Sequence, residues 1–143
     1  MKNKLKFFFI FLIFLLFNSK TISEEFNLKS KNINILEKGN IIEAAGNVEI
    51  LTDNEIVIKS DKLVWHVQKK GEVLDVVKIL GFKNVSIKTQ NEVAFSDKAL
   101  YNKDKDICKL FGNVKLKKGD SILIGDYAEV NMKTGISKLL PSP

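Results

Sequence analysis

Apolar and polar residues alternate along most of the chain beyond residue 40. In residues 42–50 the even positions hold Ile, Ala, Gly, Val and Ile, whereas Glu43, Asn47 and Glu49 occupy odd positions. The same period of two recurs in residues 77–87 and 108–116. Alternation over about five or more residues is typical of a β-strand with one buried and one solvated face. Because no window of comparable length shows helical spacing, the pattern predicts an almost entirely β chain.

Two short phrases repeat in step with this alternation. One contains an Asn-Val pair, and the other contains a Ser-Asp or Gly-Asp step. The copies of the first phrase are Ala45–Ile50, Phe82–Ile87 and Phe111–Leu116, and those of the second are Lys59–Trp65, Phe95–Tyr101 and Ile124–Val130. The Asn-Val pairs are 37 and 29 residues apart and the aspartates 36 and 29. These matching offsets indicate that the whole unit repeats in tandem.

Short polar segments separate the alternating runs and favour turns. They are Lys69–Glu72, Asn102–Asp106, Lys118–Asp120 and Lys133–Gly135. Such short connections predict antiparallel hairpins, because parallel strands need long crossovers. If the alternation ran unbroken through residues 93–101, Asp97 would point to the apolar face, at a cost of several kcal/mol. We therefore expect each repeated aspartate to mark a structural corner with a bulge, a bend or a carboxylate hydrogen-bonded to nearby backbone.

The first 23 residues have the layout of a secretory signal. Three lysines precede an apolar run from Phe7 to Phe17, and polar residues follow. We expect cleavage between Ser23 and Glu24, because this run of eleven residues is shorter than the roughly 20 that span a bilayer. A retained membrane anchor is the alternative. The remaining residues, 24–143, are long enough for one domain with a single core.

Removing the signal changes the charge balance of the chain. It takes away four of the 23 basic residues and none of the 17 acidic ones, which leaves a net charge of +2. Nucleic-acid binding therefore loses its main support, and we expect no nucleic-acid partner. The single cysteine, Cys108, and single histidine, His66, form no metal-ligand or catalytic pattern. We therefore expect neither an enzyme nor a metal or cofactor site.

The alternating pattern of these two phrases resembles the sequence pattern of the LptA/OstA-type β-domains of lipopolysaccharide transport. The phrases that carry it are Gly46-Asn47-Val48, Gly112-Asn113-Val114, Ser60-Asp61-Lys62 and Ser96-Asp97-Lys98, the last running on to Tyr101. The likeness covers residues 28–137. It implies a single open, slightly twisted antiparallel β-jellyroll built from tandem strand repeats, with an apolar interior that holds the acyl chains of lipopolysaccharide. It also implies a periplasmic protein that bridges the inner and outer membranes of a Gram-negative envelope.

The resemblance further implies partners that stack edge strand on edge strand. These are the like domains of LptC-like inner-membrane and LptD-like outer-membrane components, and further copies in a head-to-tail oligomer. Lipopolysaccharide itself is the lipid partner that the resemblance implies. The first and last strands, around Lys29–Ile35 and Ala128–Met132, would offer unpaired backbone groups for such addition. We expect residues 24–27 and 139–143 to be disordered.

The apolar side of the alternation predicts the residues that line the interior groove. They are Ile42, Ala44, Val48, Ile50, Leu63, Trp65, Val77, Ile79, Val85, Ile87, Phe95, Tyr101, Leu110, Val114, Leu116, Ile122, Ile124 and Val130. Lys83 occupies the position of a glycine on this side in the middle unit. It is therefore a candidate contact for a lipid phosphate.

Two other readings stay open at this point. An LptC-like subunit would keep its N-terminal segment as an inner-membrane anchor and carry the same β-domain. A small outer-membrane β-barrel would also combine a signal with alternating strands. Such barrels carry aromatic girdles, whereas only seven aromatic residues follow the signal.

Overall fold

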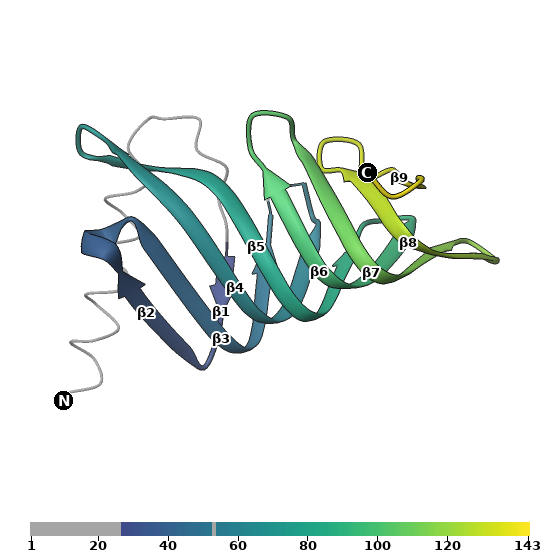
Figure 1. The fold of residues 1–143 in the computed structure, drawn as a ribbon, viewed down its shortest axis with the longest axis horizontal. Coiled ribbons are helices and arrows are strands. Elements are labelled where there is room, and N and C mark those ends of the chain that lie inside the picture. The colour runs from purple at the N-terminus through teal and green to yellow at the C-terminus, as the bar shows by residue number, and fades with distance from the viewer. Residues whose placement is uncertain (1–26, 53) are drawn as a thin grey trace.

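The computed structural model describes residues 27–143 apart from residue 53, so the predicted signal lies outside the described residues. Within that range nine β-strands and one 3₁₀ turn, Glu37–Gly39, follow one another (Figure 1). The strands are β1 (Asn27–Lys29), β2 (Asn32–Leu36), β3 (Ile41–Leu51), β4 (Val57–Lys70), β5 (Val73–Lys88), β6 (Glu92–Asn102), β7 (Ile107–Lys118), β8 (Ser121–Asn131) and β9 (Ser137–Leu139). No helix within these residues has the length and apolar character needed to cross a bilayer.

All nine strands belong to one antiparallel sheet. Its order is β1-β3-β4-β5-β6-β7-β8-β9, and β2 pairs with the half of β3 that β1 leaves open. Each long strand therefore pairs with the next one along the chain, as the short polar connections predict. The strands at the two ends of this order do not pair with each other, so the sheet stays open. The predicted open antiparallel β-fold is confirmed.

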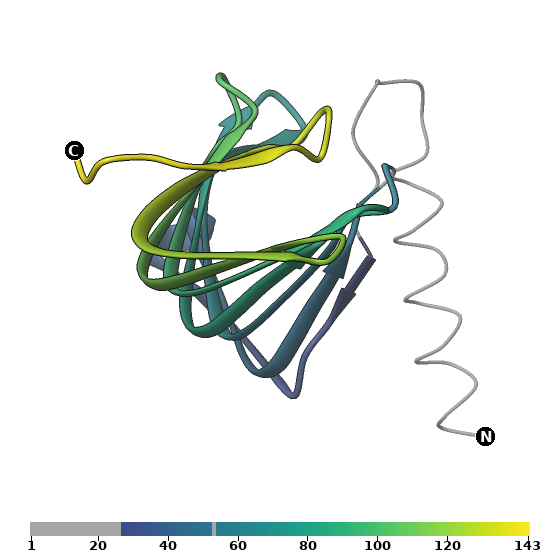
Figure 2. The same ribbon diagram turned by 90° about the vertical axis from the view of Figure 1, so that its right-hand side faces the viewer.

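Every long strand bends where the repeated phrases lie, and the bends fold the sheet into two arms (Figure 2). We call residues 41–45, 62–70, 73–82, 98–102, 107–111 and 127–131 the first arm. We call residues 48–51, 57–59, 85–88, 92–95, 114–118 and 121–125 the second arm. β2 and β9 extend the first arm, and β1 extends the second. The apolar core lies between the two arms.

The bends are β-bulges in which two residues of one strand face one residue of its neighbour. Gly112 and Asn113 on β7 both adopt left-handed backbone conformations, with φ of 79° and 46°, and lie opposite Asp97. The Asn113 side chain donates a hydrogen bond of 2.7 Å to the Asp97 carboxylate, and Asn84 donates one of 2.9 Å to Asp61. The predicted structural corner is therefore confirmed, although the carboxylate binds an asparagine side chain and not the backbone.

A buried serine lies beside the aspartate in the two corners that have a Ser-Asp step. Ser60 is 3% exposed, and its hydroxyl donates to the carbonyl of Lys62 at 2.9 Å and lies 3.0 Å from that of Phe82. Ser96 is 5% exposed and donates to the carbonyl of Lys98 at 3.1 Å. These bonds give each buried hydroxyl an acceptor within the corner.

The corners change the alternation differently on the two kinds of strand. On β3 the inward residues Ala44 and Val48 are four apart, so the same parity faces inward in both arms. On β4 the inward residues Ser60 and Leu63 are three apart, so the inward parity reverses across the corner. The same reversal occurs on β6 and β8.

The first described residue and a residue close to the C-terminus join the sheet. Asn27 pairs with Leu51, and Leu139 pairs with Ala128 and packs against the core. The predicted disorder is therefore wrong for these two residues. Ala128–Met132 is not the last strand either, because β9 pairs with Ala128–Val130 and leaves the first half of β8 as the open edge.

Lys83 holds the left-handed position that glycine holds in the other two units. Its φ is 63°, against 85° at Gly46 and 79° at Gly112. A side chain in this conformation costs about 1 to 2 kcal/mol, partly offset by the greater flexibility of glycine in the unfolded chain. We expect Lys83→Gly to raise the free energy of unfolding by about 0.5 to 1 kcal/mol, measured by urea denaturation.

The reciprocal substitution is the matched control for this prediction. Gly112→Lys should lower the free energy of unfolding by about 1 kcal/mol or more, because an added Cβ would lie 2.9 Å from an Asp97 carboxylate oxygen. A Lys83→Gly variant less stable than the original chain would contradict the equivalence of the three corners.

Candidate functional site

The apolar interior between the two arms is the candidate functional site. Thirteen of the predicted lining residues are buried in it, namely Ala44, Val48, Ile50, Leu63, Trp65, Ile79, Val85, Ile87, Tyr101, Leu110, Val114, Leu116 and Val130. Ile42 is half-buried and packs against them. The structure thus brings together residues from six long strands in one continuous lining.

Three predicted lining residues lie outside the interior. Phe95, Ile122 and Ile124 are 37%, 55% and 73% exposed. Phe95 and Ile124 lie directly opposite Lys115 on the neighbouring strands, and Ile122 lies opposite Lys117. All of them are on the outer surface of the second arm. The prediction was wrong because it assumed that the alternation set by Tyr101 and Val130 continues unbroken along β6 and β8. On these two strands the inward positions change from odd to even, or from even to odd, at the corner.

Val77 and Lys83 are also placed wrongly by simple alternation. A second bulge, at Val77 on β5 opposite His66 and Val67, leaves Val77 without a partner on β4, and Val76 packs against the core in its place. Lys83 is exposed and does not face inward, because it occupies the left-handed corner position. The proposed contact of Lys83 with a phosphate inside the groove therefore loses its geometric basis.

Several core residues were not predicted as lining. They are Ile56, Val67, Ala94, Ala99, Cys108, Ala128 and Met132. Ala94 would follow from the alternation if the reversal at the Ser-Asp step were known in advance, whereas Ala128 already has the parity of Val130. Cys108 lies on the apolar parity of β7 beside Leu110. Burial raises the pKa of its thiol to about 12, so the side chain behaves as an apolar group.

The interior reaches solvent at both ends of the sheet. At the β2 end Ile33 and Ile35 lie opposite Ala44 and Ile42, yet they are 54% and 68% exposed. At the β8 end Leu123 lies opposite Leu116 and is 41% exposed. No further strand covers these inward side chains within the described residues. The apolar lining therefore continues to each open edge.

A polar latch joins the two arms near β9, which lies along the first arm beside β8 (Figure 2). The backbone N–H of Ser137 donates to Glu92 Oε2 at 2.8 Å, and its hydroxyl donates to the same oxygen. Lys118 donates to the Ser137 carbonyl and lies 3.4 Å from Glu92 Oε1. Because Glu92 and Lys118 belong to the second arm and β9 to the first, these contacts hold the two arms together.

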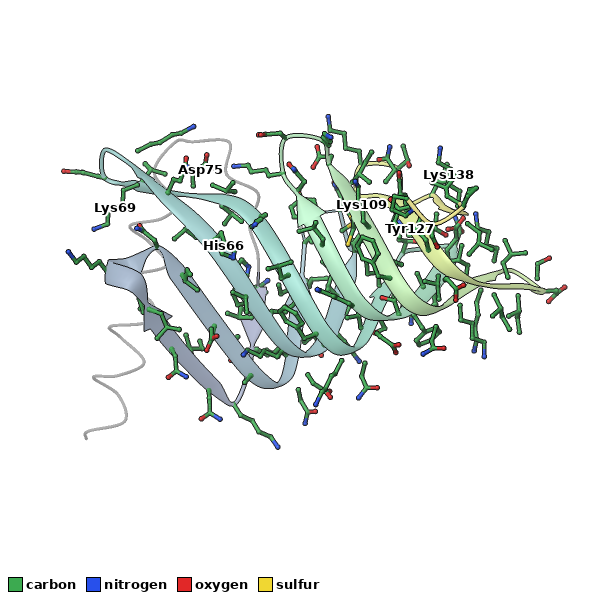
Figure 3. All side chains as sticks on the ribbon, viewed as in Figure 1. His66, Lys69, Asp75, Lys109, Tyr127 and Lys138 are labelled. Carbon is green, nitrogen blue, oxygen red and sulfur yellow. The ribbon has the colours of Figure 1, made fainter. Side chains whose placement is uncertain are left out.

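The outer surface of the first arm is mixed and does not form a convergent site (Figure 3). Lys109 and Lys138 flank Glu129 in register there, and His66 lies on a strand farther away. Asp75 binds Lys103 and Lys70, which lowers the pKa of its carboxyl group. Among the residues that the structure describes, no three His, Cys, Asp or Glu side chains gather to hold a metal ion.

A separate groove of about 610 Å³ follows the corners. Polar side chains such as Asn84, Asp97 and Asn113 line much of it, together with outward residues of the second arm. It also borders Val48 and Val85 of the apolar lining, so it adjoins the interior on the side of the corners.

Comparison with known proteins agrees with this architecture. A family model described as LptA/(LptD N-terminal domain) LPS transport protein matches residues 27–136, which confirms the resemblance identified in the sequence. The fold is similar to the crystal structure of LptH, the LptA homologous periplasmic component of the conserved lipopolysaccharide transport device from Pseudomonas aeruginosa. The TM-score is 0.66 at 11% identity, covering 80% of this chain and 81% of that one. A search of curated proteins finds no match.

The latch generates a prediction about stability. Glu92→Ala removes the acceptor of the Ser137 N–H and hydroxyl, and Ser137 is only 2% exposed. Leaving buried donors unpaired costs about 1 to 3 kcal/mol. We expect a loss of that size in chemical denaturation and faster amide hydrogen exchange in β9.

Glu72→Ala, which removes an exposed carboxylate in the turn between β4 and β5, is the matched control. It should change the stability by less than about 0.5 kcal/mol. Unaltered exchange of the β9 amides in Glu92→Ala would mean that the latch does not hold the arms.

Proposed function

The chain belongs to the family of LptA/(LptD N-terminal domain) LPS transport proteins, and on this premise we propose that it is a periplasmic carrier that holds lipopolysaccharide acyl chains between its two arms. One observation supports the site above all others. The interior is a continuous apolar lining that reaches solvent at both open ends of the sheet. A closed core would offer an acyl chain no such entrance.

An acyl chain must displace the packing that fills the interior between the arms. Val48, Leu110 and Leu116 are at most 1% exposed, so the arms have to move apart before a chain can lie between them. The corners join the arms along one side only, and the latch is a small polar contact on the other. Each CH₂ group transferred from water contributes about 0.8 kcal/mol, so a few partly covered chains offset the opening.

Transport across the periplasm requires that lipid pass from one domain to the next. The open edges, β1 with β2 at one end and the first half of β8 at the other, carry unpaired backbone groups that another strand can extend. We propose edge-strand stacking with LptC-like and LptD-like β-domains and with further copies of the chain. Stacking would place the exposed inward side chains of neighbouring edges together and make the apolar lining continuous.

In this proposal, residues 1–23 direct export of the chain to the periplasm. They act as a signal that is cleaved after Ser23 and leaves the β-domain in the periplasm. The family match favours neither an LptC-like anchored subunit nor a small outer-membrane barrel. The family consists of transport proteins, and we propose a carrier without catalytic activity. Sequencing the N-terminus of the exported protein would show whether the segment is retained.

Photo-crosslinking tests the lipid site directly. A photoreactive residue replacing Val85 or Val114, each at most 1% exposed and inward, should capture lipopolysaccharide in cells. The same residue replacing Glu49 or Lys115, on the outward parity of the second arm, should capture several-fold less. Equal capture at inward and outward positions, or none, would refute the interior as the lipid site.

Edge stacking is tested by placing charge on the exposed end of the lining. Ile33→Asp combined with Ile35→Asp should weaken head-to-tail association more than about tenfold in sedimentation experiments, since stacking would bury unpaired charges. Val73→Asp, at an exposed position near the turn between β4 and β5, is the control and should leave association unchanged. Undiminished association of the double variant would exclude this edge.

A further inference from the structure

The outer surface of the second arm carries a patch that the carrier role does not use. We propose that this patch docks the protein onto an anionic phospholipid membrane. The docking face consists of Phe95, Val93, Ile122 and Ile124 with Lys88, Lys115 and Lys117. It goes beyond the proposed function, because it concerns binding to a bilayer surface and not capture of lipopolysaccharide between the arms.

The cross-strand registers place these residues in two neighbouring rows. The row nearer the corners runs Phe95, Lys115, Ile124 across β6, β7 and β8. The next row runs Lys88, Val93, Lys117, Ile122 and begins on β5. Apolar and cationic side chains therefore alternate across a single outward surface. Directly opposed residues on neighbouring strands lie close enough to act as one surface.

Three of the four apolar members of the docking face are exposed, and Val93 is half-buried. Ile124 is 73% exposed, Ile122 is 55% and Phe95 is 37%. The ammonium group of Lys117 lies 5.6 Å from the centre of the Phe95 ring. Grouped apolar side chains of this kind mark an interaction surface more often than scattered ones do.

The charge of the docking face selects its partner. No acidic residue occurs in either row from β5 to β8. The five ion pairs found among the described residues involve other lysines. The outer surface of the first arm differs, because Lys62 pairs with Glu43 at 3.4 Å and Glu129 lies between two lysines. Unpaired lysines beside exposed Ile and Phe are the chemistry that binds anionic bilayer surfaces.

Docking and edge stacking use different surfaces of the domain. A strand added at β2 or β8 covers backbone groups at the edge, whereas the docking face points away from the interior on the opposite side of the second arm. A stacked row of domains would therefore still present it. The two proposals can fail independently.

Vesicle binding tests the docking face without lipopolysaccharide. Residues 24–143 would be sedimented with phosphatidylcholine vesicles and with vesicles that also contain phosphatidylglycerol. We expect binding to the anionic vesicles alone, weakened by added salt. Lys115→Gln with Lys117→Gln should reduce binding about fivefold per lysine. Ile122→Ser with Ile124→Ser should reduce it at least about tenfold.

The matched control removes the same charge from the first arm. Lys78→Gln with Lys109→Gln should keep binding within about twofold of the original chain, and thermal unfolding should be similar for all variants. Three results would overturn the proposal. The first is that the original chain does not bind anionic vesicles. The second is that the control variant loses as much vesicle binding as Lys115→Gln with Lys117→Gln. The third is that the original chain forms an oligomer that Ile122→Ser with Ile124→Ser dissociates, which would make the patch a contact between copies.

Photo-crosslinking from Val114 separates this outcome from the proposed function. Capture of lipopolysaccharide there with no vesicle binding would leave the carrier intact and remove only the docking face. Vesicle binding without capture of lipopolysaccharide at Val114 would support the docking face and refute the interior as the lipid site.

Discussion

The whole architecture depends on the row of bulged corners that runs across the sheet. At each corner two consecutive residues in left-handed conformations face one aspartate, and an asparagine side chain binds the carboxylate at Asp61 and Asp97. One such bulge would bend one strand. Because the corners fall at matching positions on neighbouring strands, they fold a flat antiparallel sheet into two arms and create an inside.

The corners also decide which side chains face that inside. A step of two residues through the bulge keeps the parity of β3, β5 and β7, whereas the single aspartate on β4, β6 and β8 reverses it. The lining is therefore apolar in both arms, although the two kinds of strand pass through the corner by different rules. The reversal also turns Phe95 and Ile124 outward, which creates an exposed apolar surface beside unpaired lysines.

An open sheet is an unusual solution, because unpaired edges invite association. Here both edges end in exposed inward side chains, such as Ile35 and Leu123, so the interior is unfinished at each end. The two arms are joined by backbone at the corners and by a few polar contacts at the latch. Those features suit a domain whose interior has to receive a lipid and pass it on, which agrees with its family of transport proteins.

The sequence by itself determined the strand period, the antiparallel connections, the tandem repeat and most of the lining, because these depend on local alternation and turn chemistry. It also identified the family from the Gly-Asn-Val and Ser-Asp-Lys phrases. Only the tertiary structure decided the parity of Phe95 and Ile122, the outward position of Lys83, and the latch between Glu92 and Ser137, which are 45 residues apart. Each of these depends on how a bulge or a distant strand pairs with its neighbour. Pairing between separate strands does not change the apolar–polar pattern within either strand, so the sequence does not reveal it.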